Sequence, residues 1–203
     1  MISYSIEAAL MSRCFDEVFV SSDDADCLEI AERFSATPVK RDSRLATDSA
    51  RVSDVILDFL DSSRGRKYQH GLVCCLFPAA PLRGFSDVKA VVEKVVPGAC
   101  DFAIAVTEYP LPPHQALVLN DDYSLAPKWP DLVNLRDEEV GQLLVDNGST
   151  YAAYVPSFKE QGHFYGNGLK GHFMSRETSV DINTALDLQI AMTIATAQNL
   201  DSG

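Results

Sequence analysis

The chain has 203 residues, a length that suits one α/β domain with a small appendage. Hydrophobic residues make up 46% and charged residues 23%, which allows a substantial core and argues against wholesale disorder. The formal net charge of −12 disfavours non-specific binding to nucleic acids or anionic membranes. We therefore expect neither as a partner, and an anionic substrate needs a pocket where a few cationic side chains override the overall field.

The five cysteines form no C-x-x-C pair and are odd in number, so we expect a reduced, cytoplasmic protein without structural zinc. The first residues lack the basic-then-apolar order of a secretory signal. The longest apolar runs are far too short to span a membrane.

The first half of the chain alternates between helical and extended patterns. Apolar spacing predicts an amphipathic helix at residues 2–12 and a longer one at residues 50–63. The expected strands are EVFVS (17–21), TPVK (37–40), GLVCCLF (71–77) and DFAIAVT (101–107), with helices capped by Asp23 or Asp24 and by Ser86 between them.

The continuously apolar runs at 71–77 and 101–107 are typical of strands buried on both faces of a parallel sheet. Their alternation with helices predicts an α/β fold with a doubly wound, mostly parallel, Rossmann-like sheet. No linker divides the chain, so residues 1–203 are expected to form a single domain.

This rhythm breaks at residues 108–175, which we interpret as an inserted subregion attached to the same sheet. Within it, ALVLNDDYSL (116–125) predicts a hairpin, and 149–155 and 169–175 predict strands. A final helix, capped by Asn183, is expected to bury a face made of Leu186, Ile190, Ile194 and Ala197.

Two candidate sites follow early strands. Ser22 lies in SSDD (21–24) at a strand end, where ligands of open α/β sheets bind, although an N-cap alone explains the motif. Asp48 lies in RDSRLATDSARVSDVI (41–56), which is either a ligand loop or a solvated loop with a helix cap at Asp48 or Ser49.

Two further candidates lie later in the chain. Arg83 follows the stiff turn FPAAPLR (77–83), where a guanidinium suits a phosphate or carboxylate, the alternative being a surface arginine at a helix start. Asp181 and Asn183 stand two apart in SVDINTALD (179–187), so both point the same way and offer the oxygen ligands that Mg²⁺ prefers. The alternative for Asn183 is a simple helix cap.

In order, these stretches resemble motifs of the acylneuraminate cytidylyltransferases, the CMP-sugar synthetases of the nucleotide-diphospho-sugar transferase type. MISYSIEAAL is similar to M-I-x-Y-S-I-x-x-A, and VSSDD to V-S-T-D-D. FPAAPLR resembles P-T-S/A-P-L-R, and SVDINTALD resembles D-I-D-T-x-x-D. Of the subfamilies, VCCLFPAAP (73–81) looks most like the pseudaminic acid enzymes, whereas DNGSTYAAY (146–154) is closer to the sialic and legionaminic acid enzymes.

The resemblance implies transfer of CMP from CTP to a nonulosonic, sialic-acid-type sugar with release of pyrophosphate, a Mg²⁺ cofactor and a homodimer formed through the inserted region. It implies catalytic roles for Arg83 and Asp181, with Asp181 and Asn183 as metal ligands, and nucleotide contacts from Ser22 and Asp48. The sugar contacts implied are Arg136, Asn147, Tyr151, Phe164 and Tyr165.

Three departures from the family pattern qualify this expectation. Asn183 replaces the second metal aspartate, and Ala79 replaces the threonine of the turn. The first strand and the A-R-G-G-S-K loop that binds the CTP triphosphate are not among the 203 residues, so we expect impaired turnover and a gap between the strands at 17–21 and 72–77. A catalytically inactive homologue that binds sugar or dimerises, and a nucleotidyltransferase for a KDO-type sugar, remain the alternatives.

Overall fold

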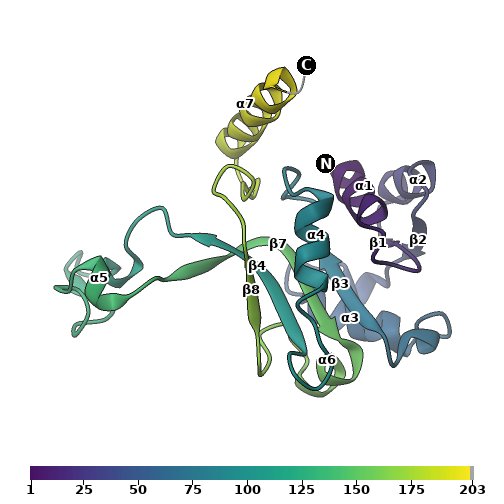
Figure 1. Ribbon diagram of the computed structural model, residues 1–203, viewed down its shortest axis with the longest axis horizontal. Helices are drawn as coiled ribbons and strands as arrows, with labels where there is room; N and C mark the ends of the chain where they lie inside the picture. Colours follow the sequence, from purple (N-terminus) through teal and green to yellow (C-terminus); the bar gives the residue numbers. More distant parts are fainter. Residues whose placement is uncertain (202–203) are drawn as a thin grey trace.

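A computed structural model describes residues 1–201, which form an α/β fold with a projecting arm and a projecting C-terminal helix (Figure 1). The main sheet has four strands in the order β3-β7-β4-β8. Their bounds are Leu72–Leu76 for β3, Leu144–Tyr154 for β7, Phe102–Glu108 for β4 and Lys170–Phe173 for β8. None of the helices in residues 1–201 is long and apolar enough to cross a membrane.

The first residues form a small two-stranded sheet with two helices, the first of which also packs against α4 (Phe85–Val92). Strand β1 (Phe19–Ser22) pairs in parallel with β2 (Thr37–Lys40), and helices α1 (Ile2–Ser12) and α2 (Ala25–Arg33) pack with them. The Asp24 side chain accepts a hydrogen bond from the Asp26 N–H at the start of α2, which confirms the expected cap. The core of this unit is made of Ile6, Val20, Ala31 and Ala36.

The expectation of a mostly parallel sheet is corrected to a mixed sheet. Strand β7 runs antiparallel to both of its neighbours, β3 and β4, whereas β4 and β8 are parallel. Strand β3 is not buried on both faces as predicted: it lies at the edge of the sheet, and Leu72 is 40% exposed. Its apolar run resembles that of a central strand, but among the described residues only β7 pairs with it.

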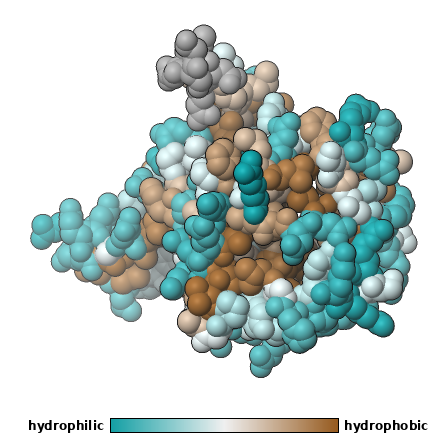
Figure 2. Space-filling model, turned by 45° about the vertical axis from the view of Figure 1, so that its right-hand side comes forward, coloured by the Kyte–Doolittle hydropathy of each residue, from teal (hydrophilic) through white to brown (hydrophobic). Residues whose placement is uncertain are grey.

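The separation expected between the early strands and β3 is present, because β1 and β3 belong to different sheets. Figure 2 turns this side of the molecule forward and shows apolar side chains gathered in the middle of the face, with hydrophilic side chains around them. The backbone groups on the edge of β3 that faces away from β7 therefore have no strand partner within the described chain.

Strand β4 is the centre of the core, and its alternate residues face two layers. Phe102, Ile104 and Val106 pack with Leu60 of helix α3 (Val52–Asp61) and Phe158 of helix α6 (Val155–Gln161). Ala103 and Ala105 face the other way, toward the buried valines of α4 (Phe85–Val92) and the turn after it. This period of two confirms the predicted buried strand.

The helix predicted at residues 50–63 is confirmed in shorter form, but its N-cap is Arg51 and neither Asp48 nor Ser49 caps it. Helix α4 is likewise not capped by Ser86. Its N-cap is Gly84, whose N–H donates to the Asp87 carboxylate at 3.0 Å.

The arm extends from the sheet between β4 and β7 (Figure 1). It carries the hairpin of β5 (Leu117–Leu119) and β6 (Leu125–Pro127), as predicted, and the short helix α5 (Asp137–Val140). Several large apolar side chains of the arm are exposed, including Leu111, Leu119, Tyr123 and Trp129.

Single 3₁₀ turns lie at Ser43–Leu45, Gly65–Tyr68 and Pro113–Gln115.

Helix α7 (Ala185–Asp201) projects away from the sheet (Figure 1), and the expected burial of its apolar face is wrong for this chain. Leu186 is 63% exposed and Ile190 is 42% exposed. The predicted cap is also corrected, because Thr184 and Asp187 cap the helix: the Asp187 carboxylate accepts from the Thr184 N–H and Oγ1. The Asn183 side chain is thereby left free for another contact.

Candidate active site

The site is organised by an irregularity in β7. Asp146 lies opposite Val106 and Tyr151 lies opposite Ile104, so β7 carries extra residues where β4 has only Ala105 between these partners. Gly148 adopts a φ of +68°, a left-handed conformation that suits glycine, and its N–H donates to Asp146 Oδ1 at 3.0 Å. Bulges of this kind redirect side chains and are frequent beside active sites.

The bulge brings the Asp146 carboxylate against two tyrosines. Tyr151 Oη lies 2.9 Å from Asp146 Oδ1 and 2.8 Å from Oδ2, and Tyr165 Oη donates to the same Oδ2. Burial, followed by the hydrogen bond to Asp146, raises the pKa of Tyr151 and raises that of Tyr165 to about 12. Both phenols therefore stay protonated at neutral pH.

One cavity, of about 220 Å³, is mostly aromatic. The Tyr151 ring lies between Phe77 and Phe164, with centroids 5.4 Å from each, and is only 8% exposed. Such rings form an apolar surface of fixed shape. The complete lining is Arg51, Val52, Ser53, Phe77, Tyr151, His163, Phe164 and Tyr165, so it gathers the three aromatic residues expected from the sequence.

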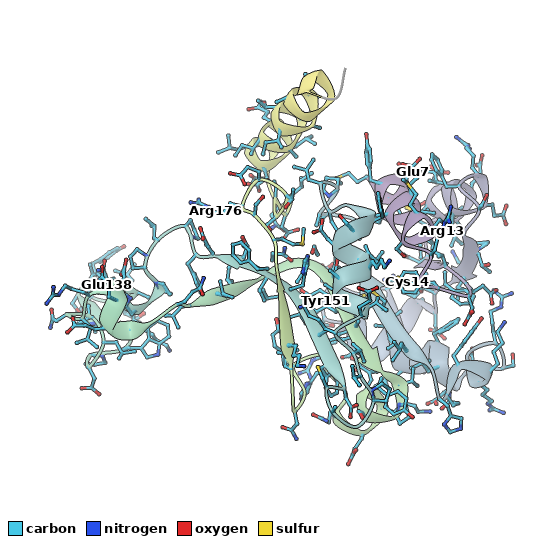
Figure 3. All side chains as sticks on the ribbon, viewed as in Figure 1. Glu7, Arg13, Cys14, Glu138, Tyr151 and Arg176 are labelled. Carbon is cyan, nitrogen blue, oxygen red and sulfur yellow. The ribbon has the colours of Figure 1, made fainter. Side chains whose placement is uncertain are left out.

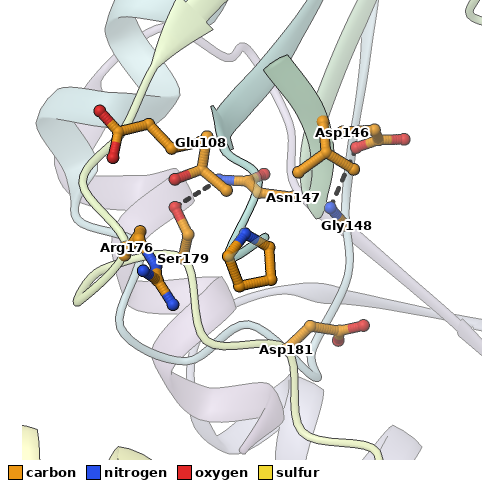
Figure 4. A pocket seen from close by; sticks show the side chains of 10 residues that line it. Glu108, Asp146, Asn147, Gly148, Arg176, Ser179 and Asp181 are labelled. Atoms are coloured by element: carbon orange, nitrogen blue, oxygen red, sulfur yellow. Dashed lines mark hydrogen bonds between the residues drawn. The ribbon is translucent and has the colours of Figure 1, made fainter. Parts of the chain in front are cut away.

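A second cavity, of about 330 Å³, is more polar (Figure 4). Glu108, Asp146 and Asp181 bring carboxylates to it and Arg176 brings a guanidinium. Thr107, a residue only 8% exposed, also lines it, and its buried Oγ1 has no hydrogen-bond partner among the described residues. Asp146 thus lines this cavity while it holds the tyrosines of the other.

Asn147 lies in the wall of the polar cavity, but its amide is already engaged. Its Nδ2 donates to Ser179 Oγ at 3.0 Å, as Figure 4 shows, and its Oδ1 accepts from the Ser149 N–H and Oγ. The residue is 5% exposed. Its present contacts fasten the bulge of β7 to the segment that leads to Asp181.

Arg83 is buried, 3% exposed, which excludes the alternative of a surface arginine. Its Nη1 donates to the carbonyls of Ser149 and Phe77, at 2.7 and 3.2 Å, and its Nη2 donates to Ser5 Oγ at 2.6 Å. Nε has no partner among the described residues, and burial lowers the pKa of the guanidinium. A buried cation held by neutral acceptors is well suited to an incoming anion.

Asp181 and Asn183 lie together as expected, and Asn183 Nδ2 donates to Asp181 Oδ2 at 2.8 Å. The Ala79 carbonyl accepts from the Ile182 N–H at 2.9 Å, so the prolyl turn that leads to Arg83 positions this pair. In residues 1–201 no three His, Cys, Asp or Glu side chains form a metal cluster. Two oxygen donors nevertheless fit Mg²⁺, which takes its remaining ligands from phosphates and water.

Three predicted residues lie apart from this group. Arg136 is at the start of α5, on the arm, with its side chain 84% exposed and 3.7 Å from Glu139. Figure 3 places the neighbouring Glu138 at the far end of the arm and Tyr151 in the sheet. Ser22 Oγ accepts from the Asp24 N–H at the end of β1, and Asp48 is exposed in the loop before α3.

Sequence reasoning missed Asp146, Arg176, Thr107 and the contribution of Arg51. The signal for Asp146 was present in DNG (146–148), because an aspartate two residues before a glycine favours a turn that its own carboxylate closes. No local pattern indicates that Tyr165 meets the same carboxylate.

Comparison with known proteins identifies the family. The model of the cytidylyltransferase family matches residues 1–106, more than half of the chain. The chain belongs to the cytidylyltransferase family. Across 94% of its length it is 31% identical to the pseudaminic acid cytidylyltransferase of Campylobacter jejuni serotype O:2, of which the match covers 83%.

Two further comparisons, at lower sequence identity, also match cytidylyltransferases or a CMP-sugar synthetase. The N-acylneuraminate cytidylyltransferase of Escherichia coli O18:K1:H7 is 26% identical over 98% of this chain and 46% of that protein. Among solved structures, CMP:2-keto-3-deoxy-manno-octonic acid synthetase complexed with CTP superposes with a TM-score of 0.67, covering 97% of this chain and 88% of the other. At 15% identity, that superposition shows a shared fold. These comparisons place the chain among the CMP-sugar cytidylyltransferases.

Proposed function

We propose that the protein transfers CMP from CTP to a nonulosonic acid, giving the CMP-sugar and pyrophosphate. The observation that carries the proposal is the convergence of Arg83, the Asp181–Asn183 pair and the aromatic cavity around the bulge of β7. A cation, two oxygen donors and a wall of ring faces are what a nucleotide–sugar transfer requires. The 31% sequence identity to a pseudaminic acid cytidylyltransferase supports a sugar of that type.

In the proposed reaction the anomeric hydroxyl oxygen attacks the α-phosphorus of CTP in line. A phosphorus–oxygen bond to the sugar forms, the bond to the β-phosphate oxygen breaks, and the hydroxyl proton passes to solvent. Asp181 and Asn183 would hold Mg²⁺, which when bound neutralises phosphate charge. The buried Arg83 adds positive charge on the side of the prolyl turn, and positioning accounts for most of the remaining acceleration.

The sugar would lie against the rings of Tyr151 and Phe164, with Tyr165 at the open side of the cavity, and Asn147 would support the wall. Ser22, at the end of β1, and Asp48, in the loop before α3, would contact the nucleotide, as the sequence resemblance implies.

We further propose a homodimer formed through the arm. Exposed Leu117, Leu119 and Leu125 on its hairpin are an apolar surface that a second copy would cover. Arg136 lies at the start of α5, which Figure 1 shows at the end of the arm, away from the part of the sheet where β7 carries Tyr151. In such a dimer, Arg136 would therefore contact the sugar in the partner's cavity.

A second candidate is a sugar-binding or dimerising homologue without catalysis. It is favoured by one observation: the Asn183 amide stands where the resemblance implies a second metal-binding aspartate, and it donates to Asp181 Oδ2 at 2.8 Å, so the pair offers a metal only one carboxylate.

The test measures pyrophosphate release from CTP with Mg²⁺ and pseudaminic acid, N-acetylneuraminic acid or KDO. Release that depends on a sugar and disappears in Asp181→Ala supports the proposed function, and the preferred sugar identifies the type. Sugar binding without release, in calorimetry, supports the second candidate. Binding of neither CTP nor any of the three sugars overturns both.

A further inference from the structure

The pairing of Asp146 with Tyr151 depends on the bulge. In a regular strand, residues five apart point to opposite faces and lie roughly 17 Å apart, at about 3.3 Å per residue. Here the Tyr151 phenol lies 2.8 Å from the Asp146 carboxylate. The bulge, the left-handed Gly148 and the Gly148 N–H bond to Asp146 together create this contact.

The number of hydrogens that these three side chains carry determines which of them can donate a hydrogen bond. A phenol has one hydrogen to donate, and an ionised carboxylate only accepts. Tyr151 and Tyr165 both give their hydrogen to Asp146. Toward a ligand, each phenol oxygen then retains only its capacity to accept.

The two rings are held differently. Tyr151 is packed edge-on to Phe77, with an interplanar angle of 86°, and against Phe164. Tyr165 is 57% exposed, and its hydrogen bond to Asp146 fixes its phenol at the mouth of the cavity. Removal of the carboxylate should therefore affect Tyr165 more than Tyr151.

We propose that Asp146 is a positioning residue that holds both phenols as hydrogen-bond acceptors, so that the aromatic cavity selects a ligand group with a donor hydrogen beside a small apolar substituent, such as an acylamino N–H. The ligand class rests on the proposed function, whereas the positioning of the phenols stands on the geometry alone. Asp146 acts through the tyrosines and is not assigned contact with the reacting atoms.

Three other titratable groups lie near the phenols. Arg51 and His163 line the same cavity, and Cys75 lies near Tyr151. Burial raises the pKa of Cys75 to about 12, so its thiol stays neutral there. The carboxylate of Asp146 is thus the group that receives both phenolic hydrogens.

The first experiment titrates tyrosine absorbance at 295 nm in the full chain and in Asp146→Asn. We expect the Tyr165 transition to move down from about 12, part of the way toward the ordinary value of about 10, so that near pH 11 the variant shows more ionised tyrosine than the parent. Asp131→Asn, which removes an exposed carboxylate on the arm, is the matched control and should titrate like the parent.

Circular dichroism at each pH checks that the variant is folded. Tyr165→Phe provides a second route that leaves Asp146 intact: the transition near pH 12 should be lost. The Asp146→Asn and parent curves should also become superimposable when each carries Tyr165→Phe. If the parent and Asp146→Asn, both with Tyr165 in place, give identical titration curves, the positioning role is overturned.

The second experiment measures calorimetric binding of N-acetylneuraminic acid and of its N-methylated amide analogue, which lacks the N–H. We expect the parent chain to prefer the N–H compound by about 10-fold or more, and Asp146→Asn to lose that preference. An unchanged preference in Asp146→Asn contradicts the ligand selection. If the parent binds neither compound while the titration shift is seen, the proposed sugar is wrong and the positioning role stands.

Discussion

The replacement of Asn183 by aspartate tests how this chain holds Mg²⁺. In the structure the Asn183 amide donates to Asp181 Oδ2, and the side chain does not cap α7. An oxygen that accepts this bond is partly withdrawn from a metal. Asn183→Asp removes the donor and adds a second carboxylate, without disturbing the Thr184–Asp187 cap.

Two effects should tighten binding. A charge of −1 placed about 4 Å from a divalent cation contributes about 2 kcal/mol in a water-like dielectric, which is the appropriate value for an exposed side chain. Release of the Asn183–Asp181 hydrogen bond removes a competing interaction of about 1 kcal/mol. Together they predict a decrease of roughly 30- to 150-fold in the Mg²⁺ dissociation constant.

Isothermal titration calorimetry with MgCl₂ at constant ionic strength measures this change without any dependence on turnover. Asn134→Asp is the matched control, because it adds the same charge at an exposed position on the arm. An Asn183→Asp variant that binds Mg²⁺ no more tightly than the parent would refute the assignment of this pair as a metal site. If Asn134→Asp increases the Mg²⁺ affinity equally, the effect comes from the net charge of the chain and not from this site.

Three further predictions concern the core, the tyrosines and the buried arginine. A Cβ at Gly166 would lie 2.1 Å from the Phe102 ring, so Gly166→Ala should lower the free energy of unfolding by about 1–3 kcal/mol in urea titrations, whereas Gly71→Ala, whose nearest atom is 3.5 Å away, should cost much less. The folded-state pKa of Tyr165 is raised to about 12, so its contribution to stability should be full below pH 10 and fall between pH 10 and 12. Denaturant melts at pH 9 and 11 should therefore show a larger loss in the parent than in Tyr165→Phe, which keeps only the losses from Tyr151 and the buried thiols. Replacing Arg83 by Met should weaken binding of pyrophosphate by at least about 10-fold in calorimetry, and an unchanged affinity would argue that the guanidinium is purely structural.

Much of the local structure follows from short-range patterns. Helical spacing predicted α3, alternation around two turn-forming aspartates predicted the β5–β6 hairpin, and a continuous apolar run predicted the buried β4. The direction of β7 was not predictable in this way. An apolar strand can pair in either sense, and the choice depends on the path of the chain through the arm before it.

The candidate site shows the same division. The types of side chain expected around the ligand are gathered in two adjoining cavities, with Tyr151 and Phe164 in one and Asp181 in the other. Arg136 is a counterexample, because its place on the arm keeps it from its own chain's cavity. The burial of Arg83 was also beyond sequence reasoning, since its acceptors come from Ser5 and Ser149, at distant positions in the chain.

The sequence by itself determined the family, the α/β class and the chemistry available at Arg83, Asp181 and Tyr151. Motifs and periodicities are local, so they can be recognised in short stretches of sequence without the fold. Only the tertiary structure decided that the sheet is mixed, that Asn183 bonds to Asp181, and that Asp146 joins the two cavities. These features depend on the bulge in β7 and on contacts between residues far apart in the chain. Their energies come from packing and from hydrogen-bond geometry, which no local stretch of sequence specifies.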